Sequence, residues 1–574
     1  MKRLAVFLKG SVKECILAPL FKLLEAIFEL LVPLIVSRVI DEGIGQGDTS
    51  LIWRCGGMLL LLAFVGLCSA ITAQFFAARA ATGFAARLKG ALMRHIYALS
   101  PAQADKLSVP TLITRLTGDV EQVQNGVNMA LRLLLRSPFI VFGAMIMAFT
   151  VDTRSALIFA VIIPLLGLCV GLLLKKTLPM FRKIQSASDD VLRTTRENLT
   201  GVRVIRAFGR QENEQESMQH AHDRLTGLQI GAQWISGLLN PLTMILIDCA
   251  LAALIYTGAV RVDIGILTQG QVVALSNYMS QILVELVKLA NLLVTLTRAM
   301  ACAGRIGQVL EIEPDLQSGT AEGDWSRDDL IVFDHAGLRY HSGAEEALHD
   351  LSFTVRKGEK LGIIGGTGSG KSSVLSLILR MYDASSGRVC IAGQSITQMS
   401  LSALREHIGY APQRPVLFCG TIRENLLMGN RKADEAQLRR ALRIAQAEDF
   451  VYSSPKGLDR LLEQQGRNIS GGQRQRLGLA RALVREGDIL LLDDVSSALD
   501  AQTDADLRRA LWQMPRDVTM LIVSQRASSV MDCDRILVLE DGKMAGLDSH
   551  ENLLKNCPVY RETYEAQYPG EAAK

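Results

Sequence analysis

Residues 360–372, KLGIIGGTGSGKS, join an apolar strand to a glycine-rich loop of the form GxxxxGKS. Residues 373–381 continue with helical composition, so strand, loop and helix follow one another as in a phosphate-binding loop. Glycines let main-chain N–H groups wrap phosphate oxygens, and the helix N-terminus adds a favourable dipole. Lys371 would reach the β- and γ-phosphates, and Ser372 would ligate Mg²⁺. The predicted nucleotide contacts in this stretch are Gly365, Gly366, Thr367, Gly368, Ser369, Gly370, Lys371, Ser372 and Ser373.

A second acidic element follows further along the chain, where residues 489–494 read ILLLDD. Four consecutive apolar residues predict a strand that is buried on both faces of a parallel sheet. Asp493, at the C-terminal end of that strand, is a natural partner for Mg²⁺. Such a strand is common by itself, so its specificity comes from following the phosphate loop.

The two parts of the 574-residue chain differ in composition on either side of residue 310. Residues 1–310 carry a formal net charge of +10 with few charged positions, whereas residues 311–574 carry −6 and resemble a soluble domain. This composition excludes a disordered, collagen-like or disulfide-rich secreted chain. The ten cysteines are scattered without a CxxC pair, so we expect them to be reduced. We predict a transmembrane domain over 1–310, a polar linker over 311–329 and a nucleotide-binding domain over 330–574.

Six apolar stretches of the first part are long enough to cross a membrane, which takes ~20 helical residues. The links at 41–53, 151–154 and 261–271 are short and almost free of Lys and Arg, whereas those at 79–130 and 176–234 are long and basic. This alternation puts both termini and the long links in the cytoplasm of a cell (inner) membrane protein. The predicted spans are 15–40, 54–78, 131–150, 155–175, 235–260 and 272–299.

Several charged residues lie inside these spans. Lys22, Glu25 and Glu29 are spaced i, i+3 and i+7, so they share one helix face. A charge at the bilayer centre costs roughly 2.5 kcal/mol or more, so these groups must face each other or an aqueous cavity. Internal pairing and a polar substrate cavity both remain open, and the excess of acid weakly favours cationic substrates. The candidate cavity residues are Glu25, Glu29, Asp248 and Glu285.

Residues 469–473 read ISGGQ and lie between the phosphate loop and the acidic strand. Here the sequence resembles the ATPases of ABC transporters, whose signature is LSGGQ. The resemblance implies that Tyr340 stacks on adenine, with a core tyrosine as the alternative. It also implies that Gln413 senses Mg²⁺ and contacts the membrane domain. The matched signature positions are Ile469, Ser470, Gly471, Gly472 and Gln473, and Ser497, Ala498, Leu499 and Asp500 match the loop that crosses the dimer interface.

The whole chain resembles an ABC exporter half-transporter. This implies a six-helix all-α transmembrane domain followed by an α/β P-loop ABC ATPase domain. It further implies a dimer in which the phosphate loop of one chain and the signature of the other enclose each ATP. Leu112–Val120 and Glu197–Phe208, one in each long link, would supply the two coupling helices.

Two positions depart from the family pattern. Asp494 stands where the family has the glutamate that acts as general base, and Gln525 stands where it has histidine. Losing one methylene withdraws the carboxylate by ~1 Å, whereas a base must lie about 2.6–3.2 Å from the proton it takes. Glutamine can donate a hydrogen bond to the γ-phosphate, but it does not titrate near neutral pH. We therefore predict a degenerate ATP site that hydrolyses slowly.

The signature departs from LSGGQ only at Ile469, and it would serve the partner's site. The chain thus resembles the degenerate-site subunit of bacterial heterodimeric multidrug exporters, whose partner would bring the missing Glu and His. We predict ATP-driven export of amphiphilic drugs, lipids or peptides, with ATP and Mg²⁺ as cofactors. The predicted partners are a second half-transporter, the lipid bilayer and a small amphiphilic substrate, without nucleic acid. An ATP-gated channel or nucleotide-regulated sensor is the alternative.

Overall fold

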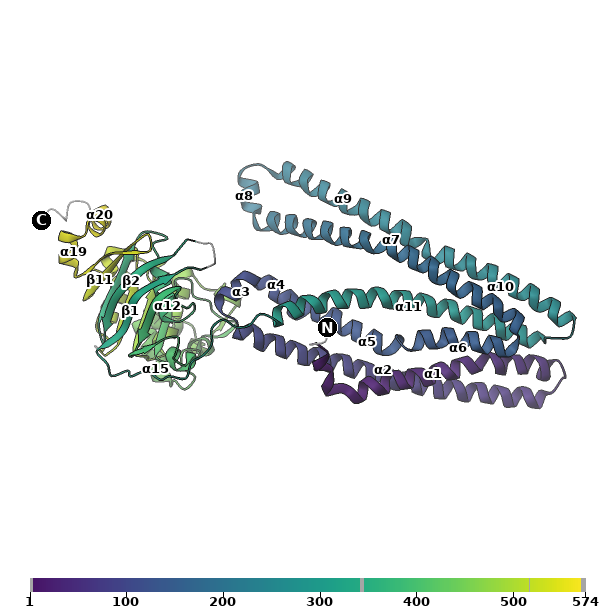
Figure 1. The fold of residues 1–574 in the computed structure, drawn as a ribbon. Helices are drawn as coiled ribbons and strands as arrows, with labels where there is room; N and C mark the ends of the chain where they lie inside the picture. Colours follow the sequence, from purple (N-terminus) through teal and green to yellow (C-terminus); the bar gives the residue numbers. More distant parts are fainter. Residues whose placement is uncertain (1–3, 341–344, 516, 569–574) are drawn as a thin grey trace. The chain divides into compact units, whose positions relative to one another are not determined.

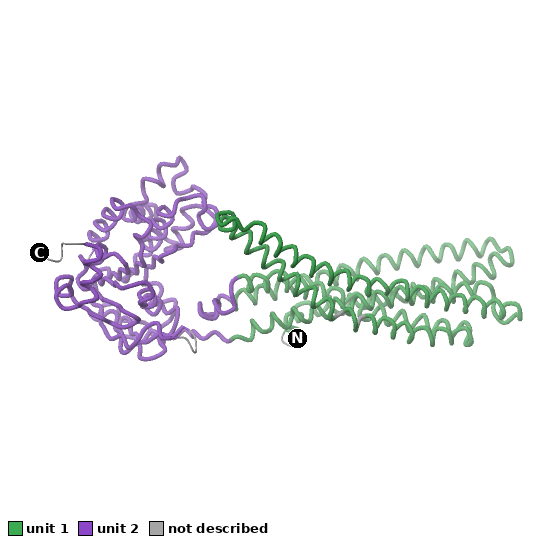
Figure 2. The backbone as a smooth tube through the Cα atoms, turned by 90° about the horizontal axis from the view of Figure 1, so that it is seen from above, with its two compact units in different colours: residues 1–95, 110–312 green, residues 96–109, 313–574 purple. Residues whose placement is uncertain are grey.

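The computed structural model describes residues 4–340, 345–515 and 517–568. The chain divides into two compact units, one of residues 1–95 and 110–312 and the other of residues 96–109 and 313–574 (Figure 2). The first unit is helical, and the second contains the β-sheets (Figure 1). Each unit is described below by itself.

Long helices run side by side in the first unit (Figure 1). Its internal core includes a buried tyrosine, Tyr278, whose hydroxyl donates to the carbonyl of Leu30 at 2.7 Å. The elements are η1 Leu4–Ser11, α1 Val12–Arg38, η2 Val39–Ile44, α2 Thr49–Ala98, α4 Val109–Thr114, η3 Arg115–Asp119, α5 Val120–Leu133, α6 Arg136–Val151, α7 Thr153–Thr200, α8 Val202–Ala207, α9 Gln211–Gly237, α10 Leu239–Asp263 and α11 Gln269–Leu310.

Five helical segments of the described chain are long and apolar enough to cross a membrane, rather than the six that we predict. The missing one is α1, which has 27 residues but carries Lys22, Glu25 and Glu29 in its middle. Length and composition therefore support five spans, and a crossing by α1 stays a prediction. The five segments are Thr49–Ala98, Val109–Val151, Thr153–Thr200, Gln211–Asp263 and Gln269–Leu310.

The first long link contains a further helix before the predicted coupling segment. The part that clusters with the sheet-containing unit is residues 96–109, which lie before the predicted coupling segment 112–120. Ser100 starts the separate helix α3 (Pro101–Leu107), because its hydroxyl accepts from the N–H of Gln103 in a capping box. The Gln103 amide in turn donates to the carbonyl of Glu313 at 2.8 Å.

Residues 112–120 instead belong to the helical unit. Asp119 is buried there and accepts from the Arg115 guanidinium at 2.8 Å and from Arg305 of α11. The prediction placed a docking helix on this segment because it combines apolar and charged residues. Those charges are used for packing within the unit, and a coupling role for 112–120 stays a prediction.

The second unit contains a six-stranded sheet in the order β12-β11-β3-β10-β9-β6, parallel except for β12. A four-stranded antiparallel sheet has the order β2-β1-β4-β5, and β7 pairs with β8. The strands are β1 Asp329–Leu338, β2 Leu348–Arg356, β3 Lys360–Gly365, β4 Ser386–Ile391, β5 Gln394–Ser395, β6 Ile408–Ala411, β7 Gly420–Thr421, β8 Leu461–Leu462, β9 Ile489–Asp493, β10 Thr519–Val523, β11 Arg535–Glu540 and β12 Lys543–Asp548.

Helices complete the second unit around these sheets (Figure 1). They are α3, α12 Lys371–Ile378, α13 Leu401–Glu406, α14 Ile422–Leu427, α15 Glu435–Ile444, α16 Glu448–Tyr452, η4 Gly457–Asp459, η5 Gln464–Gly466, α17 Gly471–Leu483, α18 Ala501–Trp512, η6 Ala527–Ser529, α19 His550–Asn556 and α20 Pro558–Gln567.

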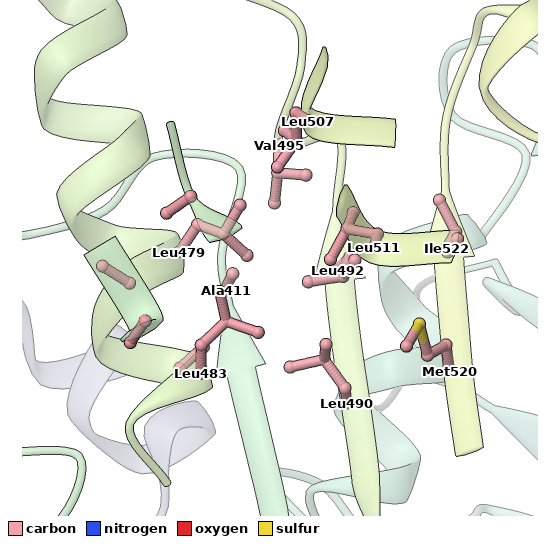
Figure 3. Close-up of a cluster of buried hydrophobic side chains, with 14 of the residues drawn as sticks. Ala411, Leu479, Leu483, Leu490, Leu492, Val495, Leu507, Leu511, Met520 and Ile522 are labelled. Atoms are coloured by element: carbon pink, nitrogen blue, oxygen red, sulfur yellow. The ribbon is translucent and has the colours of Figure 1, made fainter. Parts of the chain in front are cut away.

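The parallel sheet separates two hydrophobic cores. Side chains of β9 alternate between them, with Leu490 and Leu492 in one core (Figure 3) and Leu491 in the other. By the same alternation Asp493 points to the face of Leu491, where Val374 of α12 is packed. The strand period thus directs this carboxylate toward the helix that begins at the phosphate loop.

Candidate functional site

The phosphate loop joins β3 to α12, as the sequence predicts. Gly368 and Gly370 have left-handed φ angles of +84° and +93°. Residues with a Cβ atom rarely adopt this conformation. A Cβ atom on Gly370 would also lie 2.6 Å from a methyl carbon of Leu348. The loop therefore requires glycine at position 370 for its backbone and for its packing.

Lys371 lies at the start of α12 with only 7% of its surface exposed. Its ammonium donates to the carbonyls of Gly365 and Gly366 at 2.9 and 2.5 Å, and to the Ser369 hydroxyl at 3.3 Å. Burial lowers the pKa of Lys371, although the nearby aspartates oppose this shift. Among the described residues Lys371 makes no ion pair, so its charge is available to an anion.

Ser372 and Asp493 meet as the sequence predicts, because the Ser372 hydroxyl donates to the Asp493 carboxylate at 3.0 Å. Burial raises the pKa of Asp493, and the adjacent Asp494 raises it further. Hydroxyl, carboxylate and amide oxygens are hard ligands that suit Mg²⁺. The oxygen donors of Ser372, Asp493 and Gln413 therefore fit this ion.

Asp494 follows β9 in a left-handed conformation with a φ of +48°. Its N–H donates to the carbonyl of Val523 at 2.9 Å, which fixes the turn. Its carboxylate accepts from the side-chain amide of Gln413 at 3.1 Å. The two residues that family resemblance assigns to the base and to Mg²⁺ sensing are thus bonded to each other.

Tyr340 is half-buried, and its hydroxyl lies 2.7 Å from the Ser373 hydroxyl. Its ring meets the edge of Tyr382 at a centroid distance of 4.9 Å. The side chain packs against a core, as in the interpretation of Tyr340 as a core tyrosine. It also lines the cavity beside the phosphate loop, as in the interpretation that it stacks on adenine. That position is compatible with a base stacking on it.

One cavity of about 360 Å³ joins these groups. Its lining includes the phosphate loop, Tyr340, Gln413, Asp493, Asp494 and Gln525. Gln525 follows β10, whose Val523 pairs with Ile363 of β3. The carboxyl ends of adjacent parallel strands thus gather residues that are far apart in the sequence, as expected for an open α/β sheet.

The signature segment lies elsewhere, because none of its five described residues lines this cavity. Ser470 caps α17 because its hydroxyl accepts from the N–H of Gln473. The side-chain carbonyl of Gln473 in turn accepts from the N–H of Ser470. Main-chain N–H groups at such a helix end favour an anion. A contact between this segment and phosphate in the site of a second chain stays a prediction.

Gln475, which the sequence analysis missed, connects the signature helix to the neighbouring loop. Only 5% of its surface is exposed. Its amide donates to the Asp494 carbonyl at 3.2 Å and to the Ser497 hydroxyl at 2.9 Å, and it accepts from the Ala498 N–H at 3.0 Å. The run of glutamines and arginines after ISGGQ was its only sequence signal.

The predicted interface loop ends in a helix cap. Asp500 accepts from the N–H and hydroxyl of Thr503 at the start of α18, and these bonds lower the pKa of Asp500. Leu499 packs against the core beside the sheet. The loop is therefore held at both its apolar and its acidic positions.

The charged residues of the helical unit form a network around Arg136 of α6, a residue that the sequence analysis did not single out. The Arg136 guanidinium donates to Glu285 at 2.5 Å and to Glu29 at 2.6 Å. Three basic and three acidic residues balance one another. We call Lys22, Glu25, Glu29, Arg136, Glu285 and Lys288 the Arg136 cluster.

Asp248 does not join this cluster. It is exposed on α10 and makes no ion pair among the residues that the structure describes. The four predicted cavity residues thus separate into three internally paired glutamates and one exposed aspartate. Of the paired residues, Glu29 keeps 40% of its side chain exposed, and Glu285 keeps 3%.

Residues 197–208, predicted as a coupling segment, cover the end of α7 and the short helix α8. The segment exposes Leu199 and Phe208 at 72% and 76% of their surfaces. A coupling role for this segment stays a prediction.

Comparisons with known proteins agree with this architecture. A family model described as ABC transporter transmembrane region matches residues 15–286, and one described as ABC transporter matches residues 348–497. An uncharacterized ABC transporter ATP-binding protein, YfiB, of Bacillus subtilis (strain 168) is 34% identical over 575 residues, covering 100% of both chains. This chain belongs to the ABC transporter family.

Two further likenesses extend the comparison of this ABC transporter. A probable multidrug resistance ABC transporter ATP-binding/permease protein, YheI, of Bacillus subtilis (strain 168) is 32% identical, covering 84% of this chain and 82% of its own. The structure of a bacterial Atm1-family ABC exporter with ATP bound superposes with a TM-score of 0.83 at 22% identity. It covers 97% of this chain and 99% of that chain, and at this identity it indicates the fold alone.

The predicted fold class is confirmed: a helical transmembrane domain precedes a sheet-containing ABC ATPase domain. Membership of the ABC transporter family also implies ATP binding. The slow hydrolysis inferred from Asp494 and Gln525 stays a prediction, as does the identity of the second chain.

Proposed function

We propose that this chain is one subunit of an ATP-driven exporter that moves amphiphilic drugs, lipids or peptides out of the cytoplasm. The observation that carries the proposal is the buried ammonium of Lys371, which meets only uncharged oxygens in a cavity lined by Tyr340 and Asp493. A buried cation that makes no ion pair among the described residues favours an anionic ligand. The triphosphate of ATP supplies that anion.

In this proposal the residues of the cavity contact different parts of ATP. Lys371 and the main-chain N–H groups of the loop hold the β- and γ-phosphates, and Tyr340 stacks on the adenine. Ser372, Asp493 and Gln413 hold Mg²⁺, which when bound neutralises charge on the phosphate oxygens. Gln525 donates to the γ-phosphate.

Hydrolysis at this site is slow in our proposal because Asp494 is a poor base. Its carboxylate is one methylene shorter than that of glutamate, and it accepts from Gln413 at 3.1 Å. The signature at the start of α17 serves the phosphate loop of a second chain, which brings the Glu and the His. A heterodimer with one slow and one fast site follows.

The movement of substrate requires that ATP binding reaches the membrane helices. We propose that the exposed apolar segment around α8, with Leu199 at the end of α7 and Phe208 directly after α8, docks on the ATPase domain of the second subunit. Closure of the two ATPase domains on ATP then turns the cavity from inward- to outward-facing. The chain would lie in the cell (inner) membrane with both termini in the cytoplasm.

The substrate cavity in this proposal includes Asp248 and the exposed part of Glu29. The Arg136 cluster neutralises its own glutamates, so a preference for cations rests on Asp248. A carboxylate among membrane helices is costly in lipid, and a water-filled cavity satisfies it. This favours amphiphiles that carry a positive charge.

Transport in proteoliposomes tests the proposal. The chain is reconstituted alone and together with a candidate partner half-transporter that has Glu and His at the positions of Asp494 and Gln525. ATP hydrolysis and uptake of a fluorescent amphiphilic cation are measured in inside-out vesicles. We expect ATP-dependent accumulation with both chains, and far slower hydrolysis by this chain alone. Rapid hydrolysis by this chain alone would contradict the slow site.

Matched variants separate a pump from a channel. Lys371→Met should reduce accumulation, and Asp248→Asn should weaken uptake of the cation more than that of a neutral amphiphile. Dissipation of a preformed gradient by ATP, in place of accumulation, would instead support the ATP-gated channel.

A further inference from the structure

We propose that Gln567, at the end of the C-terminal helix α20, is a positioning residue that fixes Gln525 for its contact with the γ-phosphate. The Gln567 amide donates to the carbonyl of Gln525 at 2.8 Å and accepts from the N–H of Ala527 at 2.8 Å. One side chain therefore bridges two main-chain groups on either side of Arg526. We call this pair of bonds the Gln567 clamp, and the inference rests on the proposed function of Gln525.

Gln567 is held in place because α20, the helix that carries it, packs into the core through Tyr560. Tyr560 is fully buried in that helix, and its hydroxyl lies 2.7 Å from Nδ1 of His550 in α19. One turn further on, Tyr564 stacks on Tyr568 with ring centroids 4.9 Å apart. These contacts fix the end of α20, so Gln567 can hold a loop in place.

The other side of Gln525 is fixed by the sheet. The Ser524 N–H donates to the carbonyl of Ile363 in β3 at 3.1 Å, and its hydroxyl accepts from the Arg526 N–H at 3.0 Å. The main chain around Gln525 is therefore held by β3 before it and by Gln567 at and after it. Between these supports Gln525 lines the nucleotide cavity.

A clamp matters more for glutamine than for the histidine that the family has at this position. Glutamine has one more rotatable side-chain bond, so ordering it against a phosphate loses more conformational entropy. A main chain that is already fixed reduces the freedom that remains to be lost on binding. The chain thus compensates for a flexible contact by holding its backbone from a distant helix.

Retention of a photoreactive ATP analogue tests the clamp in the complete transporter. The assembled protein is loaded with 8-azido-ATP and Mg²⁺, chased with unlabelled ATP, and illuminated at intervals. Denaturing gels then report the label on this chain alone. We expect Gln567→Ala to speed loss of the label about threefold to tenfold, the effect of one weakened hydrogen bond.

Two matched variants make the result specific. Gln567→Glu keeps the acceptor for Ala527 but loses the donor to Gln525, so it should give an intermediate rate. Arg561→Ala changes an exposed residue of the same helix and should leave retention unchanged. Gln567 is itself exposed, so its variants should unfold at the temperature of the unmodified protein. A lower unfolding temperature with unchanged retention would indicate a purely structural role and overturn the inference.

A double-mutant cycle gives the decisive readout. If Gln567 acts through Gln525, Gln567→Ala should have no further effect on retention in a Gln525→Ala background. Additive effects would overturn the clamp. Lys371→Met distinguishes the two proposals: labelling that needs no more analogue than the unmodified chain contradicts nucleotide binding by this cavity, whereas labelling that needs more analogue, together with a neutral Gln567→Ala, contradicts the clamp alone.

Discussion

The nucleotide cavity and the Arg136 cluster both bury a cation near carboxylates, yet they treat its charge in opposite ways. Arg136 donates to Glu29 and Glu285 at hydrogen-bond distance, so its charge is neutralised within the protein. Lys371 meets only carbonyls and a hydroxyl, so its charge is left for a ligand. The comparison teaches that the partners of a buried charge, rather than its burial, separate a structural residue from a binding one.

The largest effect that this comparison predicts is on stability. Arg136→Leu should lower the free energy of unfolding by about 3–5 kcal/mol, because it leaves Glu285 buried without its main partner. Thermal unfolding in detergent would measure the loss. The double variant Arg136→Leu with Glu285→Leu should regain most of it, since two apolar groups can replace a buried ion pair. A single variant as stable as the unmodified protein would break the comparison.

The second prediction concerns the opposite behaviour of Lys371. Lys371→Met should weaken ATP binding about 10- to 100-fold, since charge-assisted hydrogen bonds to phosphate are lost. The unfolding temperature without nucleotide should not fall, because no ion pair is broken. Isothermal titration calorimetry and thermal unfolding measure the two quantities, with the exposed Lys432→Met as control. A stability loss equal to that of Arg136→Leu would remove the distinction.

A third, smaller effect sharpens the description of the nucleotide cavity. Asp494→Glu should raise the hydrolysis rate at this site about tenfold, because the longer side chain carries the base closer to the attacking water. Asp494→Asn keeps the length of the native side chain but cannot take a proton, so it should give no increase. Single-turnover hydrolysis by the assembled transporter checks both. An equal rate for Asp494→Glu and the unmodified chain would mean that the base is not what limits this site.

The smallest predicted effect is on pH dependence. Burial raises the pKa of Asp493, so the folded protein holds a proton there at a pH where an unfolded aspartate has lost it. Stability without nucleotide should therefore rise as the pH falls toward the raised pKa. Mg²⁺-dependent ATP binding should weaken over the same range, because Mg²⁺ needs the ionised carboxylate. Asp493→Asn should remove the first dependence, and unfolding without nucleotide at pH 5 and pH 7 measures it.

Sequence predicted the nucleotide cavity better than the Arg136 cluster for a physical reason. The phosphate loop is contiguous with its neighbours, so residues 360–378 already contain the strand, the loop and the helix in their order. The Arg136 contacts join α6 to α1 and α11 across more than a hundred residues, and no local pattern specifies them. The same limit hid Gln475 and Gln567, whose side chains meet distant main-chain groups. Ser100 and Pro101, by contrast, form a local start signal for helix α3 that the sequence analysis did not use.

The contact that Gln475 makes with the carbonyl of Asp494 has a consequence for substitutions at position 494. Every residue type has a main-chain carbonyl, so this contact is indifferent to the side chain at position 494. A substitution of the side chain at position 494 therefore leaves this support of the signature helix α17 in place. The residue at position 494 and the signature segment can therefore change independently of each other.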